Sequence, residues 1–312
     1  MDLQRACRLL QASILTHQIS DGDAKSLDPA TTAALSKIHI DTTTVQSTMR
    51  GGAPGIDACF YGKTTDGDGI LAFRGTLKPQ LALESLAEVR AVTDDWLQDT
   101  EAMPVQGTNL PGLVHTGFCN ALDDLWPAIV SWNLGATPRL YVTGHSKGGA
   151  VAHLAACRLA TIGIPVTEVY SFAAPRAGTR AFVEAFNKLI PACWRFEYQD
   201  DLVPHLPPET GGWLTHLSDF QSAEPARVVP AEVQSFINQI ERIANLSYAS
   251  AGTLQFLNWS TPPAIETDGF FLPLQRNLHL AQLVAEGRLM QIVGDHAATA
   301  GYTTAISHLA PV

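Results

Sequence analysis

The hexapeptide Gly144-His145-Ser146-Lys147-Gly148-Gly149 places a serine in the pattern Gly-x-Ser-x-Gly. It follows an apolar run at residues 140–143 and precedes a helical pattern that begins near residue 149. A serine at a tight strand-to-helix turn projects its hydroxyl away from the sheet, and glycines on either side let backbone segments approach closely. Such a hydroxyl attacks acyl carbonyls when a nearby base removes its proton. Ser146 is therefore the predicted nucleophile, and an ordinary glycine-rich turn is the competing interpretation.

The neighbours of Ser146 are expected to contribute backbone groups to the chemistry. The N-terminus of the following helix favours negative charge near the hydroxyl. The backbone N–H of Lys147 is the expected donor to an oxyanion that forms on the substrate. The side chains of His145 and Lys147 are expected to point elsewhere, so neither is assigned as the base.

The segments that must position this turn alternate between strands and helices. Short apolar or β-branched runs predict strands at residues 58–61, 70–73, 139–143, 166–172 and 194–198. Helices are predicted between these strands at residues 150–160 and 180–189. The rhythm predicts an α/β fold in which helices cover both faces of a mostly parallel central sheet.

The ends of the chain are less regular than this central part. Residues 1–50 are expected to form a packing helix, with apolar positions from Leu3 to Ile14, followed by a loop-like stretch rich in Ser, Asp and Thr. Another amphipathic helix is predicted at residues 231–245. We find no internal repeat or low-complexity linker, so residues 1–312 are expected to form a single domain, although a boundary near residue 210 is also compatible with the sequence.

Six ordered segments are similar to a known family. They are Ala72-Phe73-Arg74-Gly75-Thr76, Asp95-Trp96-Leu97-Gln98-Asp99, Val114-His115-Thr116-Gly117-Phe118, the hexapeptide around Ser146, Phe172-Ala173-Ala174-Pro175-Arg176, and Asp201-Leu202-Val203-Pro204-His205-Leu206-Pro207-Pro208. In this order they resemble the class 3 lipases, the fungal-type triacylglycerol lipase family, over roughly residues 55–210. The resemblance implies the α/β-hydrolase fold and a catalytic triad in the order Ser, Asp, His.

The resemblance places the triad acid at Asp201, directly after the strand at residues 194–198. Loops gather above the sheet at the C-terminal ends of parallel strands, where an acid can orient an imidazole. Asp200 is a rival, but strand-like alternation would send the two side chains to opposite sides, so that only one reaches the base. Asp201 is the favoured acid.

Three C-terminal histidines are candidates for the base: His279, His296 and His308. The pattern Asp295-His296, with Tyr302 downstream, resembles the family's Asp-His segment, so His296 is the choice. His279 lies within an apolar helical run and fits a core or surface role. His308 lies near a terminus that is expected to fray.

The second oxyanion donor is implied by the resemblance to be Thr76, through its backbone N–H and its hydroxyl. After Thr76 the sequence departs from the family pattern, because residues 77–94 are inserted before the Asp-Trp-Leu segment. Leu83, Leu86 and Ala87 fall at helical spacing in this insertion. A short amphipathic lid helix is one interpretation, and a permanently packed surface helix is the other.

Composition limits the partners. The formal net charge is −10, without clustered Lys and Arg, which argues against nucleic-acid binding. Five scattered cysteines contain no Cys-x-x-Cys pair, and no His or Cys cluster has metal spacing, so no metal or cofactor is expected. No apolar stretch is long enough to span a membrane, so lipid contact is expected to be peripheral. No secretory signal is recognised, so the protein is expected to be cytoplasmic or exported by another route.

The predicted reaction is therefore hydrolysis of carboxylic esters of lipids through an acyl-enzyme on Ser146. A phospholipase A or a short-chain carboxylesterase would use the same triad. Two less favoured hypotheses are acyl transfer to an acceptor other than water, which needs the same residues, and a binding module in which the triad is vestigial.

Overall fold

A nine-stranded sheet forms the centre of the computed structural model, which describes residues 1–50, 57–76, 102–209, 245–267, 271–286 and 294–310, together with Asn238, Ile243, Gly269 and Arg288. In spatial order the strands are β1 (Gly22–Asp23), β2 (Ile40–Arg50), β3 (Asp57–Thr64), β4 (Gly69–Phe73), β7 (Leu140–His145), β8 (Glu168–Phe172), β10 (Cys193–Tyr198), β12 (Thr253–Leu257) and β13 (Ile265–Glu266). The five strands from β4 to β12 pair in parallel, and the outer strands on both sides pair antiparallel. The predicted parallel centre is confirmed.

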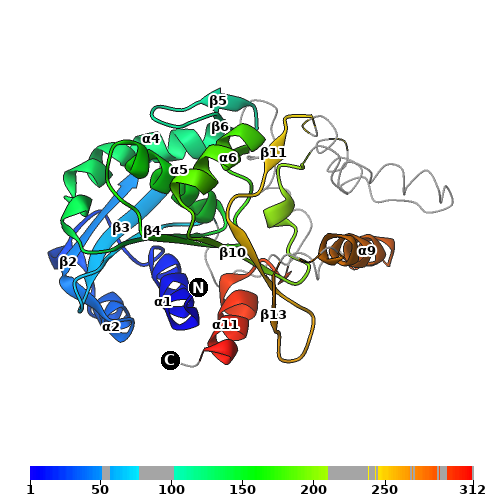
Figure 1. Ribbon diagram of the computed structural model, residues 1–312. Helices are drawn as coiled ribbons and strands as arrows, with labels where there is room; N and C mark the ends of the chain where they lie inside the picture. The colour runs from blue at the N-terminus through cyan, green and yellow to red at the C-terminus, as the bar shows by residue number, and fades with distance from the viewer. Residues whose placement is uncertain are drawn as a thin grey trace.

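Helices cover both faces of this sheet (Figure 1). One face carries α1 (Leu3–Leu15), α2 (Pro29–Lys37) and α11 (Thr303–Leu309), and the other carries α4 (Thr116–Ser131), α5 (Lys147–Thr161) and α6 (Arg180–Leu189). Each face has its own cluster of buried apolar side chains. Because burial on both faces favours continuous apolar runs, β4 and the first part of β7 could be predicted from their composition.

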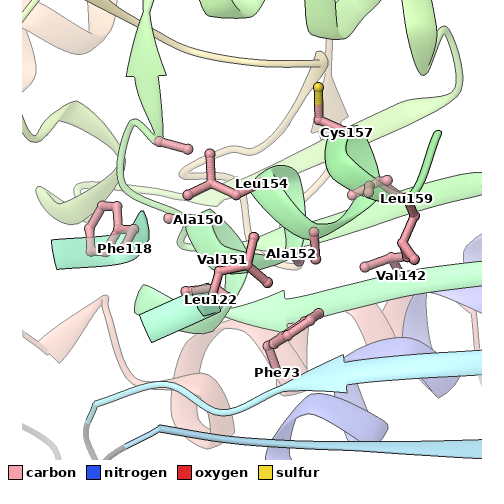
Figure 2. Packing of buried hydrophobic residues seen from close by; sticks show 14 of the residues in the cluster. Phe73, Phe118, Leu122, Val142, Ala150, Val151, Ala152, Leu154, Cys157 and Leu159 are labelled. Carbon is pink, nitrogen blue, oxygen red and sulfur yellow. The ribbon is translucent and has the colours of Figure 1, made fainter. Parts of the chain in front are cut away.

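The packing beneath α5 brings this helix close to the sheet. Its buried residues include Gly148, Gly149, Ala150 and Ala152, which are small enough to let the helix backbone approach the strands. Larger side chains from the strands and from α4, such as Phe73, fill the space around them (Figure 2). α5 starts directly after β7, so this packing also fixes the turn between the two elements.

The expectation for residues 1–50 is wrong in its second half. After the predicted first helix, the chain forms α2 and then β2, an eleven-residue antiparallel strand, where a loop-like stretch was expected. Asp28 caps α2 by accepting hydrogen bonds from the backbone N–H groups of Ala30 and Thr31. Residues 40–50 are polar because this strand lies towards the edge of the sheet, but their β-branched Thr and Val side chains suit a strand.

A second, four-stranded sheet lies outside the central one. Its order is β11 (Tyr248–Ala249), β9 (Gly178–Thr179), β6 (Leu113–His115) and β5 (Pro104–Gln106), with antiparallel pairing throughout. Strands of two or three residues are too short to show a period of two, and none of them was predicted.

Two sequence predictions concern residues outside the part of the chain that the structure describes. The insertion at residues 77–94 lies outside the described residues, and so does most of the helix expected at residues 231–245. The single-domain organisation also stays a prediction.

The helix α9 (Leu272–Ala285) includes His279, as its helical pattern indicated. Among the described residues, no helix has the length and apolar character needed to cross a membrane.

Candidate active site

Ser146 occupies a strained turn between β7 and α5. Its backbone φ of 57° and ψ of −133° lie in a region that non-glycine residues rarely adopt. The two flanking glycines are sterically required, because a Cβ on Gly144 would lie 2.1 Å from the carbonyl oxygen of Gly148, and one on Gly148 would lie 2.4 Å from that of Phe73. The turn therefore holds the serine hydroxyl at the C-terminal edge of the parallel strands.

The structure brings Ser146, His296 and Asp201 together. Nε2 of His296 lies 2.9 Å from Oγ of Ser146, and Nδ1 of the same ring lies 3.0 Å from Oδ2 and 3.1 Å from Oδ1 of Asp201. Exposed fractions are 2% for Ser146, 0% for Asp201 and 4% for His296. This order of contacts fits proton transfer from the hydroxyl to an imidazole that a carboxylate orients.

The carboxylate of Asp201 has two further partners. Tyr302 donates a hydrogen bond of 2.7 Å from its hydroxyl to Oδ2, and the backbone N–H of Val203 donates one of 3.0 Å to Oδ1. The Tyr302 hydroxyl also accepts a hydrogen bond of 3.0 Å from the backbone N–H of Tyr198, at the end of β10. In the sequence, Tyr302 served only to identify the segment around His296. In the structure it contacts Asp201 itself.

His145 forms a hydrogen bond with the backbone of His296. Its buried ring lies 3.1 Å, through Nε2, from the carbonyl oxygen of His296. Burial is the main cause that lowers the pKa of His145 well below its ordinary value, and the nearby His296 lowers it further. The ring of His145 is therefore neutral, and its Nε2 carries the proton that is donated. The sequence offered no signal for this contact, because it joins residues that are far apart in the chain.

The loop after β4 lies against the turn that carries Ser146. A Cβ on Gly75 would lie 2.9 Å from the carbonyl oxygen of His145 and 3.3 Å from Cβ of Ser146. Next to Gly75, the hydroxyl of Thr76 is buried and has no hydrogen-bond partner within the described part of the chain. A buried, unpartnered hydroxyl beside a nucleophile is available to a substrate oxygen.

Lys147 begins α5, so its backbone N–H has no acceptor one turn earlier in the helix. Its side chain turns away, and Nζ lies 2.6 Å from Oδ1 of Asp57 on β3. The ammonium is therefore used in an ion pair, and the oxyanion contact expected of the backbone N–H stays a prediction.

Asp200 and His279, the alternative candidates for the acid and the base, pair with each other. Nδ1 of His279 lies 2.7 Å from Oδ1 of Asp200, and neither side chain has a described contact with Ser146. His308 lies on α11 and has no described contact with the serine either. Of the three C-terminal histidines, His296 alone has a described contact with the Ser146 hydroxyl.

Asp295, next to His296 in the chain, has a carboxyl group with a raised pKa. Burial raises its pKa to about 7, and the negative charges of Asp200 and Asp201 act in the same direction. A hydrogen bond of 3.2 Å from the backbone N–H of Asp200 to Oδ2 of Asp295 opposes part of this rise. Asp295 therefore titrates near neutral pH.

This titration predicts a pH dependence of stability. Because the folded-state pKa of Asp295 is raised, its contribution is fully present below about pH 4 and is lost as the pH rises towards 7. The loss is at most about 4 kcal/mol, and partial solvent access reduces it. Asp295→Asn should flatten this dependence, so urea unfolding at pH 5 and pH 8 should show a gain over wild type that is larger at pH 8. Equal differences at both pH values would contradict the assignment.

Replacing Tyr302 with phenylalanine removes the hydroxyl that binds Asp201. A hydrogen bond to a charged group is worth about 1.5–3 kcal/mol, so we expect kcat to fall about 10- to 100-fold. Tyr248→Phe is the matched control, because the buried Tyr248 hydroxyl donates to the carbonyl of Ala102 instead. Equal kinetics in the two variants would show that the Tyr302 hydroxyl does not support the acid.

The cysteines of the chain are buried thiols. Burial raises the pKa of both Cys119 and Cys157 to about 11, which keeps these thiols protonated at neutral pH. All five cysteines are free and buried. Within the described ranges, no group of three or more His, Cys, Asp or Glu side chains is arranged to hold a metal ion.

Part of this chain is similar to known lipases. Residues 70–211 match the family model described as Lipase (class 3). A secreted mono- and diacylglycerol lipase from Fusarium solani is 39% identical over 105 residues, which cover 32% of this chain and 31% of the relative. The chloroplastic phospholipase A(1) DAD1 of Arabidopsis thaliana is 26% identical over 228 residues, which cover 65% of this chain and 50% of the relative. The chain thus spans half or less of these curated relatives.

The fold is shared more widely than the sequence. The crystal structure of a mono- and diacylglycerol lipase from Aspergillus oryzae matches 96% of this chain and 95% of its own chain, with a TM-score of 0.61 and 17% identity. This likeness confirms the predicted α/β-hydrolase fold.

Proposed function

Because residues 70–211 match the class 3 lipase family model and the fold is that of a mono- and diacylglycerol lipase, we propose that the chain is a lipase of this family and hydrolyses carboxylic esters of lipids through an acyl-enzyme on Ser146. The observation that carries this proposal is the position of His296, with one ring nitrogen 2.9 Å from the serine hydroxyl and the other on Asp201. The family match and the relatives support the same reaction.

In the first half-reaction, Oγ of Ser146 attacks the ester carbonyl carbon while Nε2 of His296 takes the hydroxyl proton. Asp201 keeps Nδ1 of His296 protonated and stabilises the imidazolium that forms. The tetrahedral intermediate then collapses, the C–O bond to the alcohol breaks, and the alcohol leaves with the proton from Nε2. The product is an acyl ester of Ser146.

In the second half-reaction, Nε2 of His296 takes a proton from water, and the resulting hydroxide attacks the acyl carbon. The fatty acid leaves as Ser146 regains its proton. The negative oxygen formed in each half is stabilised by the backbone N–H of Lys147 and by the backbone N–H and hydroxyl of Thr76. One such donor is typically worth about 3–4 kcal/mol in the transition state.

Phospholipase A activity is the second candidate. It is supported by the phospholipase A(1) relative, whose match covers 65% of this chain. A short-chain carboxylesterase would use the same triad.

Three kinds of substrate separate these candidates when they are incubated with the purified protein. They are a triacylglycerol emulsion, a diacylphosphatidylcholine dispersion, and soluble p-nitrophenyl esters of short to long acyl chains. We expect free fatty acid from the acylglycerol and faster turnover of the longer nitrophenyl esters. Acid released mainly from the phospholipid would favour the phospholipase, and activity restricted to short soluble esters would favour the carboxylesterase. An added alcohol that captures most of the acyl group would indicate acyl transfer, and absence of any acyl product would contradict the proposal.

We also propose that contact with lipid is peripheral and that the protein acts in the cytoplasm or after secretion. The Fusarium solani relative is named as a secreted protein. Cell fractionation with an antibody against the chain tests the compartment, and co-sedimentation with neutral-lipid vesicles tests the contact.

A further inference from the structure

Asp200 and His279 form a second carboxylate–imidazole pair next to the triad. Nδ1 of His279 lies 2.7 Å from Oδ1 of Asp200, and Nε1 of Trp259 donates a hydrogen bond of 3.1 Å to the same oxygen. Asp200 is fully buried, whereas 35% of the His279 side chain is exposed. The other oxygen of Asp200 is buried and has no hydrogen-bond partner in the described part of the chain. The imidazole and the indole N–H are thus the described donors that compensate this carboxylate.

The pair is linked to two triad residues through their chain neighbours. Asp200 precedes Asp201, and its backbone N–H donates to Oδ2 of Asp295 over 3.2 Å. Asp295 in turn precedes His296. A shift of Asp200 would therefore move the segment that carries the acid relative to the segment that carries the base.

The helix α9 contacts the acid segment, residues 197–205, at more than one point. One turn before His279, Arg276 lies 2.6 Å from Oε2 of Glu197 on β10 and 3.1 Å from Nε2 of His205. Residues three apart on a helix share a face, so both side chains reach the acid segment from the same side. Glu197 lies before Asp201 in the chain and His205 lies after it.

The pair has no described nucleophile of its own. The imidazole of His279 borders a surface hollow of about 430 Å³ that is also lined by Trp259, Glu266, Gln275, Leu278 and Gln282. None of these side chains carries a hydroxyl or thiol group. A direct catalytic role for His279 is therefore not supported, and its contacts point to a role in positioning.

We propose that Asp200 and His279 are positioning residues that fix the distance between Asp201 and His296, which deepens the proposed function and rests on it. Removing the imidazole leaves a buried carboxylate with one donor fewer, and the acid segment is expected to move to hydrate it. The Asp201–His296 hydrogen bond should then lengthen, and kcat should fall with little change in KM, because neither side chain of the pair has a described contact with Ser146.

The test compares His279→Leu and His279→Asn with Gln275→Leu, a matched control on α9 whose side chain is exposed. Asparagine keeps a donor near the position of Nδ1. For a soluble short-chain ester, we expect about a 10- to 100-fold loss of kcat in His279→Leu, recovery in His279→Asn to within about fivefold of wild type, and no loss in Gln275→Leu. Asp200→Asn serves as the second variant if His279→Leu does not fold.

A spectroscopic readout separates this proposal from the proposed function. The downfield proton NMR signal of the His296 Nδ1–H reports the hydrogen bond to Asp201 whether or not the protein cleaves any ester. The signal should shift or broaden in His279→Leu and be retained in Gln275→Leu. An unchanged signal together with a kcat within twofold of wild type in folded His279→Leu would overturn the proposal. Absence of esterase activity in wild type would overturn the proposed function instead.

Discussion

Replacing Ser146 with alanine should lower kcat for ester hydrolysis by on the order of 10⁵-fold or more, because the acyl-enzyme cannot form. The overall structure should be retained, since the described hydrogen bond of the Oγ atom is the one to His296. The measurement is the initial rate of nitrophenyl ester hydrolysis at saturating substrate.

The matched control is Ser13→Ala. Ser13 is also buried, and its hydroxyl donates to the carbonyl of Leu10 within α1. This control should leave kcat within about twofold of wild type, because Ser13 lies in α1 and has no described hydrogen bond to the triad. Comparable activity in Ser146→Ala and Ser13→Ala would show that the nucleophile lies elsewhere.

Asp201→Asn should lower kcat/KM by about 10⁴-fold, the second largest effect we expect. Asparagine keeps the shape of the side chain, but it removes the charge that stabilises the imidazolium and can turn its amide N–H₂ group towards Nδ1 of His296, which favours the wrong tautomer. The distances of 3.0 and 3.1 Å to His296 show that both oxygens of Asp201 face the ring.

Asp200→Asn is the natural comparison, since this residue is adjacent and also buried. Its effect should be at most about 100-fold, because Asp200 contacts His279 and acts on the triad only through position. A larger loss in Asp200→Asn than in Asp201→Asn would reverse the assignment of the acid.

The central strands and the turn at Ser146 could be predicted because their signals are local. The runs at residues 70–73 and 140–143 are buried on both faces, and Gly144 is set by a backbone contact with Gly148, which is close in sequence. β2 was missed because a polar strand near the sheet edge has no continuous apolar run.

Choosing the base needed more than the residues themselves. His279 and His296 each face a buried aspartate, and both aspartates lie in the same dipeptide. The distinguishing feature is the distance to Ser146, a tertiary property that no local pattern encodes. Resemblance to the family favoured His296, because it follows an aspartate and precedes Tyr302.

The contacts of His145 and Tyr302 with the triad could not be predicted either, because they too are tertiary contacts. His145 meets the carbonyl of His296 across 151 positions of the chain, and Tyr302 meets Asp201 across 101. Each contact depends on how the ends of β7 and β10 are brought beside the C-terminal segment.

Covalent labelling with a fluorophosphonate, followed by peptide mapping in a mass spectrometer, tests the central claim most directly. The reagent phosphonylates a serine whose hydroxyl is activated by a neighbouring base. We predict a single adduct on Ser146 in wild type, formed together with loss of ester hydrolysis, and no adduct in His296→Ala over the same time. Ester hydrolysis that persists without an adduct on Ser146, or an adduct on another residue that abolishes activity, would contradict the account.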